Sequence, residues 1–434
     1  MLEAMRSEAR RLFDVAVAAA DPQRAVAGAL KAAPIGGRRV WIVAVGKAAR
    51  AMAEAAQAHL ALSAPESGPT GDLDSSGAES GPIASAPSVA GAIVVTNAEN
   101  AAPLAGAEVH VAGHPVPDAG GLRASEAVEA MLARTGPGDV VLALISGGGS
   151  ALLPAPVAGV TLDDKAAASR LMLGAGLDIT EMNSVRQHLS RLKGGGLAQA
   201  AAPARVVALI LSDVIGDDLR AIASGPTVAP ICSRSAARAL LQDRGLWEPM
   251  PASVRAALER EGDDAPPPAA ENRLIGSNRM SLDAMVAESG AEIWSDRLTG
   301  DVGDAADWLV GRIRAAPPGR APALCGGETT VSLRGQGRGG RNQELALRVA
   351  AGMAGVARPW VFLSGGTDGR DGPTEAAGGL VDGGTLERIA AAGGDWRALL
   401  EDNDSHRALG LSGDLLVTGG TGTNVADVQI VILG

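Results

Sequence analysis

Short apolar runs that end at glycine turns recur along this chain, and they constrain its fold more than any other feature. Strands buried on both faces of a parallel sheet read as continuous runs of Val, Ile and Leu, and ligands gather at the loops beyond their carboxyl ends. Glycine at such a turn lets backbone amides approach an anion closely. The pattern therefore predicts an α/β enzyme that handles small charged metabolites. The runs that end at glycine are Trp41–Val45, Val140–Ile145, Ala321–Cys325, Trp360–Leu363 and Leu415–Thr418, and a sixth run, Val206–Leu211, ends at Ser212-Asp213.

The length of the chain and the order of its elements predict two domains. The chain has 434 residues, more than one hydrophobic core usually covers. Strand and helix signals alternate in both halves, which is typical of α/β folds. A passage rich in proline and charge indicates the boundary. We expect an N-terminal domain over 1–245, a linker over 246–272 and a second domain over 273–434, with a Ser- and Gly-rich insertion near 63–88 that does not pack.

The composition excludes several classes of function. The formal net charge is −11, there is no Tyr and there are two Phe, so nucleic acid is not an expected partner. The cysteines Cys232 and Cys325 lie far apart in sequence, which favours a reducing, cytoplasmic location. No uncharged apolar stretch is long enough to span a bilayer. The expected partners are small molecules, and the oligomeric state stays open, with a homodimer as one option.

Lys47 stands where a buried strand meets the start of a helix. The pair Gly46-Lys47 suggests a P-loop, but the chain has Trp41 where that motif needs glycine and Ala48 where it needs Ser or Thr. A lysine at this junction adds its charge to the positive end of the helix dipole. It is either part of an anion site or an exposed surface lysine, and both readings stay open.

A glycine-rich loop precedes Arg341. Gly335, Gly337 and Gly340 have the G-x-G-x-x-G spacing of a dinucleotide-binding loop, but the acidic residue expected about 20 positions later is missing. Arginine at the start of the following helix favours phosphate or carboxylate binding instead, because a guanidinium pairs with oxyanions bidentately. The other reading is a surface turn. The glycines expected to bind an anion are Gly337, Gly339 and Gly340.

Two further segments carry candidate substrate-binding groups. One is a loop after a buried strand, whose backbone amides are expected to bind an anion. It consists of Ser146, Gly147, Gly148, Gly149 and Ser150. The other is a polar stripe on a helix predicted over 161–193, which ends at a triple glycine. Its members are Asn183, Arg186, Ser190 and Lys193. Such a stripe is either a solvated face or part of a binding site.

Carboxylates follow two of the buried strands. Asp213 and Asp368 are the candidate ligands for Mg²⁺, which prefers oxygen ligands and needs only one or two protein carboxylates beside substrate phosphates. The neighbouring acids Asp217 and Asp371 are explained by helix capping or turn formation. The chain has no H-E-x-x-H, C-x-x-C or G-x-S-x-G motif, which argues against a zinc site and against a serine hydrolase.

Six ordered motifs carry a family resemblance. They are SGGGSALLPAP (146–156), NSVRQHLSRLKGGGLA (183–198), LILSDVIGDDLRAIASGPT (209–227), GGETTVSLRGQGRGGRNQELAL (326–347), LSGGTDGRDGPTEAAGG (363–379) and TGGTGTNVADV (418–428). Together they resemble the glycerate 2-kinases of the MOFRL type, some of which bear the older name hydroxypyruvate reductase. The resemblance implies an N-terminal Rossmann-like domain, whose parallel sheet has helices on both faces. It also implies a C-terminal α/β MOFRL domain and an active site in the cleft between the two domains.

The same resemblance implies a reaction. ATP and Mg²⁺ would serve to phosphorylate (R)-glycerate at its 2-hydroxyl, giving 2-phosphoglycerate and ADP. The essential basic residues fall on Lys47 and Arg341, which we expect to converge on one pocket, and Asp213 is the candidate Mg²⁺ ligand or proton acceptor. The rival readings are an NAD(P)-dependent hydroxypyruvate reductase and a non-catalytic sensor that binds an organic acid.

Overall fold

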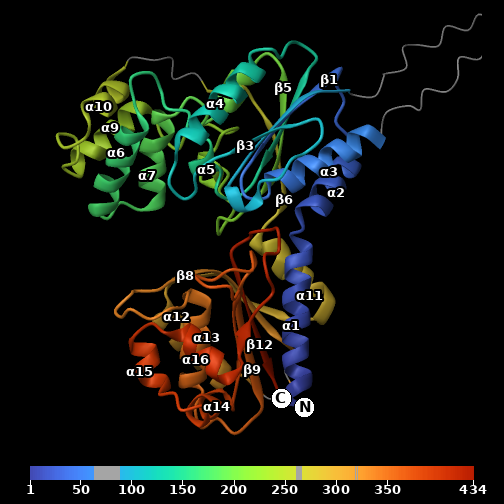
Figure 1. Cartoon of the computed structure of the whole chain (residues 1–434), viewed down its shortest axis with the longest axis vertical. Helices are drawn as coiled ribbons and strands as arrows, with labels where there is room; N and C mark the ends of the chain where they lie inside the picture. The colour runs from blue at the N-terminus through green and yellow to red at the C-terminus, as the bar shows by residue number, and fades with distance from the viewer. Residues whose placement is uncertain (63–87, 261–265, 318, 320) are drawn as a thin grey trace, which may run out of the picture. The chain divides into compact units, whose positions relative to one another are not determined.

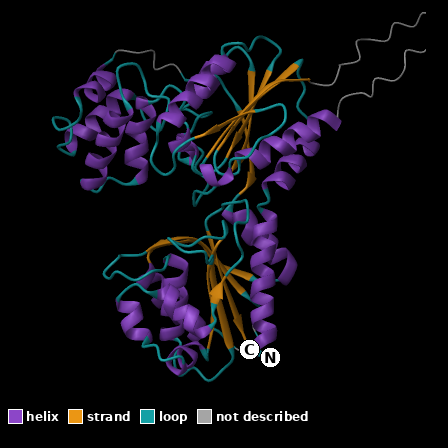
Figure 2. Cartoon of the chain, in the orientation of Figure 1, coloured by secondary structure: helices purple, strands orange, loops and turns teal. Residues whose placement is uncertain are grey.

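The computed structural model describes residues 1–62, 88–260, 266–317, 319 and 321–434. These residues form two compact units, drawn in Figures 1 and 2. The first-sheet unit comprises Pro22–Ile210 and Leu219–Ile275, and the second-sheet unit comprises Met1–Asp21, Leu211–Asp218 and Gly276–Gly434. The expected two-part α/β fold is confirmed. The chain divides differently from the predicted domains 1–245 and 273–434, and the predicted insertion at 63–88 lies, except for Ser88, outside the described residues.

Six strands form the first sheet in the order β3-β2-β1-β4-β5-β6. The neighbours from β3 to β5 pair in parallel, as the continuous apolar runs predicted. From β1 the chain adds β2 and β3 on one side, and it then returns to add β4, β5 and β6 on the other side, so the strand order reverses between β1 and β4. Open α/β sheets bind ligands beside the carboxyl ends of strands at such a switch point. The strands are β1 Arg39–Val45, β2 Ser88–Thr96, β3 Glu108–Val111, β4 Val140–Ile145, β5 Arg205–Leu211 and β6 Glu271–Gly276.

The helices of the first-sheet unit fall into two groups. Helices α2, α3, α4, α5 and α8 accompany the sheet, and α6, α7, α9 and α10 form a separate cluster with its own buried apolar core (Figure 1). Their bounds are α2 Pro22–Ala32, α3 Ala49–Leu62, α4 Ala119–Leu132, α5 Gly149–Leu152, α6 Leu162–Gly174, α7 Ile179–Arg186, α8 Gly196–Ala201, α9 Arg234–Asp243 and α10 Ala252–Glu259, with short 3₁₀ helices η1 Ala98–Asn100, η2 Gln187–Leu189 and η3 Ile222–Ser224.

The helical cluster corrects two expectations. The helix predicted over 161–193 is interrupted, because Gly176 adopts a left-handed φ of 74° and Asp178 starts a new helix with its own capping box. The linker predicted over 246–272 is also wrong in its first half. Met250 and Val254 are buried in the core of this cluster, and α10 lies within the predicted linker.

The second sheet has the order β11-β10-β9-β12-β8-β7 and is mixed. Among its described strand pairs, β7–β8 is parallel and the others are antiparallel, so of the last three glycine-ended runs only Ala321–Cys325, in β8, has a parallel neighbour. Gly326 and Gly327 continue β8 instead of ending it, because their missing side chains leave room for Asn278 and Leu298. The strands are β7 Glu292–Asp301, β8 Ala323–Thr330, β9 Trp360–Gly366, β10 Gly378–Asp382, β11 Leu415–Leu416 and β12 Asp427–Leu433.

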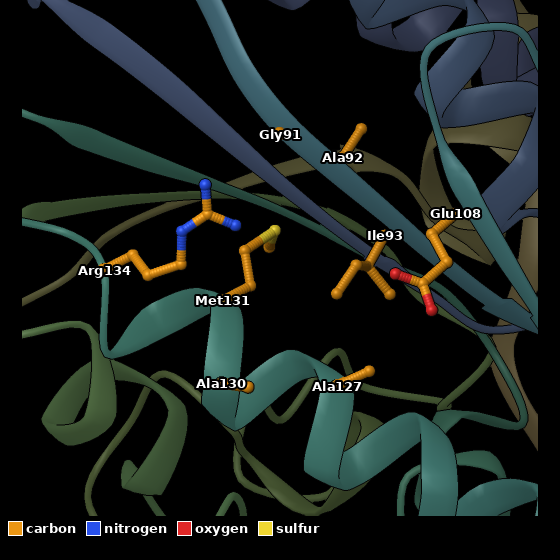
Figure 3. A pocket seen from close by; sticks show the side chains of 8 residues that line it. All are labelled: Gly91, Ala92, Ile93, Glu108, Ala127, Ala130, Met131 and Arg134. Atoms are coloured by element: carbon orange, nitrogen blue, oxygen red, sulfur yellow. The ribbon is translucent and has the colours of Figure 1, made fainter.

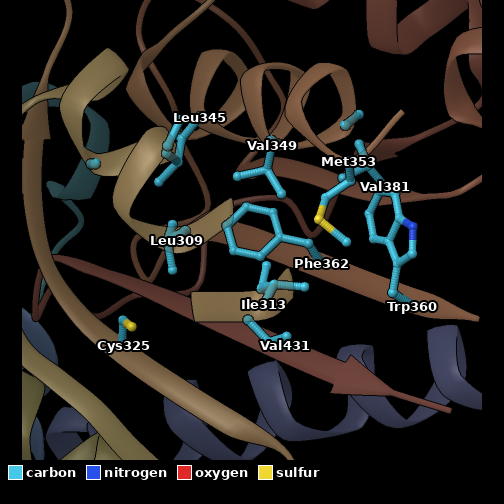
Figure 4. Close-up of a cluster of buried hydrophobic side chains, with 14 of the residues drawn as sticks. Leu309, Ile313, Cys325, Leu345, Val349, Met353, Trp360, Phe362, Val381 and Val431 are labelled. Carbon is cyan, nitrogen blue, oxygen red and sulfur yellow. The ribbon is translucent and has the colours of Figure 1, made fainter. Parts of the chain in front are cut away.

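Helices cover both faces of the second sheet, and the alternation of side chains along β9 shows how. Trp360 and Phe362 belong to a core shared with α12 and α13 (Figure 4). Val361 and Leu363 belong to a second core shared with α1 and α11. The N-terminal helix is therefore part of the second-sheet unit. The bounds are α1 Leu2–Ala19, α11 Asn278–Ser289, α12 Val302–Ala315, α13 Arg341–Gly352, α14 Thr385–Ala391, α15 Trp396–Glu401 and α16 Ser405–Ser412. Among the described residues, no helix combines the length and apolar character needed to cross a bilayer.

Candidate functional site

The loops after β1 and β4 are joined by hydrogen bonds at the switch point of the first sheet. The Lys47 amide donates to the Gly147 carbonyl over 2.9 Å, and the Ala48 amide donates to the Ser146 hydroxyl over 3.1 Å. Ser146 is buried and also bonds the end of β1 through its own amide. Its hydroxyl thus fixes the loop that carries Lys47 in place.

Glycine is required where these two loops touch. Gly46 has a φ of 124°, and a Cβ built on it would lie 2.2 Å from the Ser146 hydroxyl oxygen. A Cβ on Gly148 would lie 3.0 Å from the His114 ring and 3.5 Å from Cγ of Lys47. Lys47 therefore lies directly beside Gly148 and His114.

A cavity of about 690 Å³ opens next to this junction, within the first-sheet unit. It is bounded by the His114–Pro117 turn, the start of α5, helix α6, Arg186 and Lys193. Of the residues predicted from sequence, Gly148, Ser150, Arg186 and Lys193 line it directly. Among the described residues, none accepts a hydrogen bond from the amides of Gly147–Ser150, so these amides are available to a ligand.

Four basic residues line the cavity, namely Lys165, Arg170, Arg186 and Lys193. Lys165 donates to the Pro154 carbonyl over 2.7 Å, and Arg186 donates to the Ser169 hydroxyl over 3.2 Å. Lys193 donates to the Ser150 hydroxyl over 2.9 Å and to the Ser150 carbonyl. These acceptors are neutral, so the hydrogen bonds hold the cations in place without cancelling their charge.

Burial and mutual repulsion alter the ionisation of this cluster. Burial first, and then the charges of Arg186 and Arg191, lower the pKa of Lys165 to about 7. The pKa of Lys193 is lowered well below its usual value by burial and then by Lys165 and Arg186. Burial and then the charge of Lys47 lower the pKa of His114. A bound anion would reverse each of these effects.

Asn183 supports the cavity without lining it. Its side-chain carbonyl lies 3.4 Å from the Ser224 hydroxyl, which is 2.8 Å from the Ser150 hydroxyl. Ala223 and Ser224 have left-handed φ values of 49° and 62°, a conformation that costs free energy for residues with side chains. Gly149 makes this packing possible, since a Cβ on it would lie 2.9 Å from Cβ of Ala223.

Arg341 lies in the second-sheet unit, where carboxylates occupy its guanidinium. It forms a bidentate pair with the buried Asp427, at 2.6 and 3.0 Å, and a further ion pair with Glu328 at 3.0 Å. Burial lowers the pKa of Arg341, but the hydrogen bond and charge of Asp427 outweigh this and raise it overall. The arginine predicted to clamp an anion is thus held by two acidic groups.

Intramolecular contacts account for the glycine-rich loop before Arg341. The Gly335 and Gly337 amides donate to Asn403 and Asp402, and added Cβ atoms on Gly337, Gly339 and Gly340 would collide with residues 371 and 402–405. The N-terminus of α13 is filled as well. Its Asn342 and Gln343 amides donate to the Asp371 carboxylate over 3.1 and 2.8 Å. The anion that this loop binds in the structure is a side chain of the same chain.

The two predicted magnesium ligands also belong to the second-sheet unit. Asp213 follows β5 in a partly buried loop, and Asp368 follows β9, where its carboxylate accepts the Arg370 amide over 3.0 Å. Within the described residues, no group of three or more His, Cys, Asp or Glu side chains could hold a metal ion. A metal bound here would therefore need most of its ligands from a substrate and from water.

A second, smaller cavity of about 290 Å³ lies between β2, β3 and α4. Figure 3 shows its two charged side chains, Glu108 and Arg134, at opposite ends of an otherwise apolar lining. Arg134 also stacks over the Trp41 ring at 5.0 Å. This cavity has no convergent charges. The larger cavity lined by Lys165, Arg186 and Lys193, called the cationic cavity from here on, is therefore the stronger candidate for the functional site.

Sequence reasoning missed two residues of the cationic cavity. These residues, His114 and Lys165, are not among those predicted from the sequence. Lys165 had a readable signal, since the chain contains four lysines in total, and a rare residue type in a polar position merits attention.

Comparisons with known proteins agree over most of the chain. Residues 8–259 match a family described as "Domain of unknown function (DUF4147)", and residues 321–427 match the MOFRL family. A D-glycerate 2-kinase from Thermotoga maritima is 36% identical, with 99% of each chain covered. A putative hydroxypyruvate reductase from Agrobacterium vitis is 42% identical, with 99% of this chain and 94% of that protein covered. The crystal structure of a glycerate kinase from Thermotoga maritima, 35% identical, covers 100% of both chains with a TM-score of 0.87.

Proposed function

We infer the function from one premise: the chain belongs to the family of glycerate kinases that combine a DUF4147 domain with a MOFRL domain. It is a glycerate 2-kinase, which uses ATP to phosphorylate the 2-hydroxyl of (R)-glycerate and releases 2-phosphoglycerate and ADP. The observation that carries this conclusion is the match to a D-glycerate 2-kinase over 99% of both chains. The cationic cavity beside Lys47 supports it, because glycerate and phosphoryl groups are anions.

We assign the roles of the residues as follows. Phosphoryl transfer needs alignment of the reactants and cations that stabilise the charge of the transferring group. Lys47 supplies that charge at the end of β1, and the Gly147–Ser150 amides bind oxyanions beside it. Arg341, in the second-sheet unit, is the second basic residue that we assign to the transferring group. Asp213 accepts the hydroxyl proton or binds metal.

Mg²⁺ belongs to the same proposal. Oxygen ligands suit it, and the described carboxylates fit only a site that a nucleotide completes. Asp213 and Asp368 are the candidate protein ligands, and the ion would neutralise phosphate charge when bound. Both cysteines are free thiols, which suits a cytoplasmic location for an ATP-dependent enzyme.

The test compares two assays on the purified chain. ADP release with (R)-glycerate, ATP and Mg²⁺, with phosphorus NMR to identify the product, is expected to show 2-phosphoglycerate. Oxidation of NADH or NADPH with hydroxypyruvate tests the rival that the relative from Agrobacterium vitis bears as its name. Reductase activity without ADP release would replace the kinase assignment. Metal-independent glycerate binding without either activity would favour a sensor.

A further inference from the structure

Lysine is scarce in this protein, and its positions are not scattered. Of 38 basic residues, the lysines are Lys31, Lys47, Lys165 and Lys193, and all others are arginine. Lys165 and Lys193 line the cationic cavity, and Lys47 lies beside Gly148 and His114, which also line it. Lys31 is exposed on α2. Three of the four lysines of the chain therefore lie in or beside this one cavity, together with Arg170 and Arg186.

The charges of the cavity are unbalanced. None of the described carboxylates forms an ion pair with Lys165, Arg186 or Lys193, and Asp163 is the one acidic residue in the lining. Burying unpaired charge is costly, so such a cluster is expected only where an anion compensates it.

Several N–H donors of this cluster have no hydrogen-bond acceptor among the described residues. An ammonium group has three N–H donors, and among the described residues only the Pro154 carbonyl accepts one from Lys165. Arg186 uses its Nε on Ser169, and its terminal nitrogens have no described acceptor. Lys165 and Arg186 thus retain several donors for a ligand, already positioned by neutral groups.

We propose that Lys165, Arg186 and Lys193 form the subsite that binds the carboxylate of the hydroxy-acid substrate, and that Lys165 selects for this group. The proposal rests on the glycerate kinase function. Nucleotide phosphates are the other anions of this reaction, and the KM for ATP in the experiment below distinguishes the two ligands. A substrate that lacks the carboxylate, such as glycerol, leaves the cations unpaired and is rejected.

The experiment compares Lys165→Met with the matched surface variant Lys31→Met. The readouts are the KM for (R)-glycerate, the KM for ATP, and calorimetric binding of (R)-glycerate without nucleotide. For Lys165→Met we expect the KM and Kd for glycerate to rise about tenfold or more, since a charge-assisted hydrogen bond is lost, while the KM for ATP is unchanged. Lys31→Met leaves all three unchanged. Thermal unfolding confirms folding, which is not at risk because methionine removes a buried charge.

Each other outcome decides the proposal. A higher KM for ATP with unchanged glycerate binding would assign the cluster to nucleotide phosphates, and unchanged values for both would remove it from the binding site. If the wild-type chain binds glycerate without releasing ADP, and Lys165→Met weakens that binding, the subsite stands and the kinase function falls. If the wild-type chain neither binds glycerate nor releases ADP, both are overturned.

Discussion

At the scale of single residues, Gly46 determines whether the loops after β1 and β4 can meet. Gly46→Ala combines a φ of 124° with a Cβ 2.2 Å from the Ser146 oxygen. The backbone strain alone costs roughly 1–3 kcal/mol, and the displaced loop carries Lys47. We expect chemical denaturation to show at least this loss, together with a large drop in kcat/KM.

The matched control is Gly28→Ala, because a Cβ at Gly28 on α2 meets no atom within 4 Å. It is expected to leave activity unchanged and to stabilise the chain by roughly 0.5–1 kcal/mol. Equal behaviour of the two variants would mean that the junction does not position Lys47.

The ionisation of Lys165 predicts how glycerate binding depends on pH. Its pKa is about 7 in the free protein, so above that pH the side chain is a neutral amine, which must take up a proton before it can pair with a carboxylate. Affinity is therefore fully present below about pH 7 and falls as pH rises, by at most about tenfold per pH unit. Calorimetry between pH 6.5 and 8.5 measures this.

The other titratable groups around this cavity are Asp163, Arg170, Arg186, Arg191 and Lys193, with His114 across the cavity. Burial lowers the pKa of His114, away from this range. The pKa of Lys193 is also lowered, so the affinity of Lys165→Met for glycerate should still fall as pH rises. This fall should be shallower than in the wild-type chain. An equally steep slope would exclude Lys165 as its source.

At the scale of elements, α1 is a structural part of the second sheet. Phe13 is fully buried against β9, where a Cβ on Gly365 would lie 2.7 Å from its ring. Phe13→Ala is expected to cost about 3–5 kcal/mol, and hydrogen exchange should accelerate in β9 and β12 but not in β1 and β4. Arg10→Ala, on the exposed face of α1, is the control and should change stability by less than about 0.5 kcal/mol. Uniform acceleration across both sheets would contradict this assignment of α1.

Sequence patterns predicted elements better than they predicted partners. Strands β1, β4 and β5 of the first sheet follow from apolar runs and the turns that end them, because burial on both faces leaves a local signature. The strand directions in the second sheet do not follow from the sequence, because the apolar pattern of β9 would be the same for a parallel or an antiparallel β12. The place of α1 was equally unreadable, because an amphipathic helix shows that it packs but not where.

The candidate site also combines features that local sequence marks with contacts that depend on the fold. A strand end and glycines in the sequence indicated Lys47 and the Ser146–Ser150 loop as candidates. The occupation of Arg341 by Asp427 could not be foreseen, since these residues are 86 positions apart and the pairing depends on how β12 enters the sheet. Lys193 was predicted for a wrong reason. The prediction placed it on a helix that runs to residue 193, but in the structure the last helical segment before it ends at Leu189.

At the scale of the whole molecule, the roles that we propose assign Lys47 and Arg341 to one reaction, although they belong to different units. Arg341→Ala alone is a poor test, because it removes the ion-pair partner of the buried Asp427, at a cost of about 3–5 kcal/mol. The double variant Arg341→Ala with Asp427→Asn removes that charge. We expect it to melt near the wild-type temperature yet lose several kcal/mol of transition-state stabilisation, as Lys47→Ala does. Near-normal kcat/KM in the double variant would exclude Arg341 from the reaction.

The packing of α1 has a consequence for how the protein is made. Leu12 and Phe13 share their core with Val428 and Ile430 of β12, a strand that also joins β8 to β9. Ribosomes add about 5–20 residues per second, so roughly 20–80 s separate the synthesis of these partners. During that interval the apolar face of α1 has no β12 to pack against. We expect a ribosome-associated chaperone to bind this face of the nascent chain.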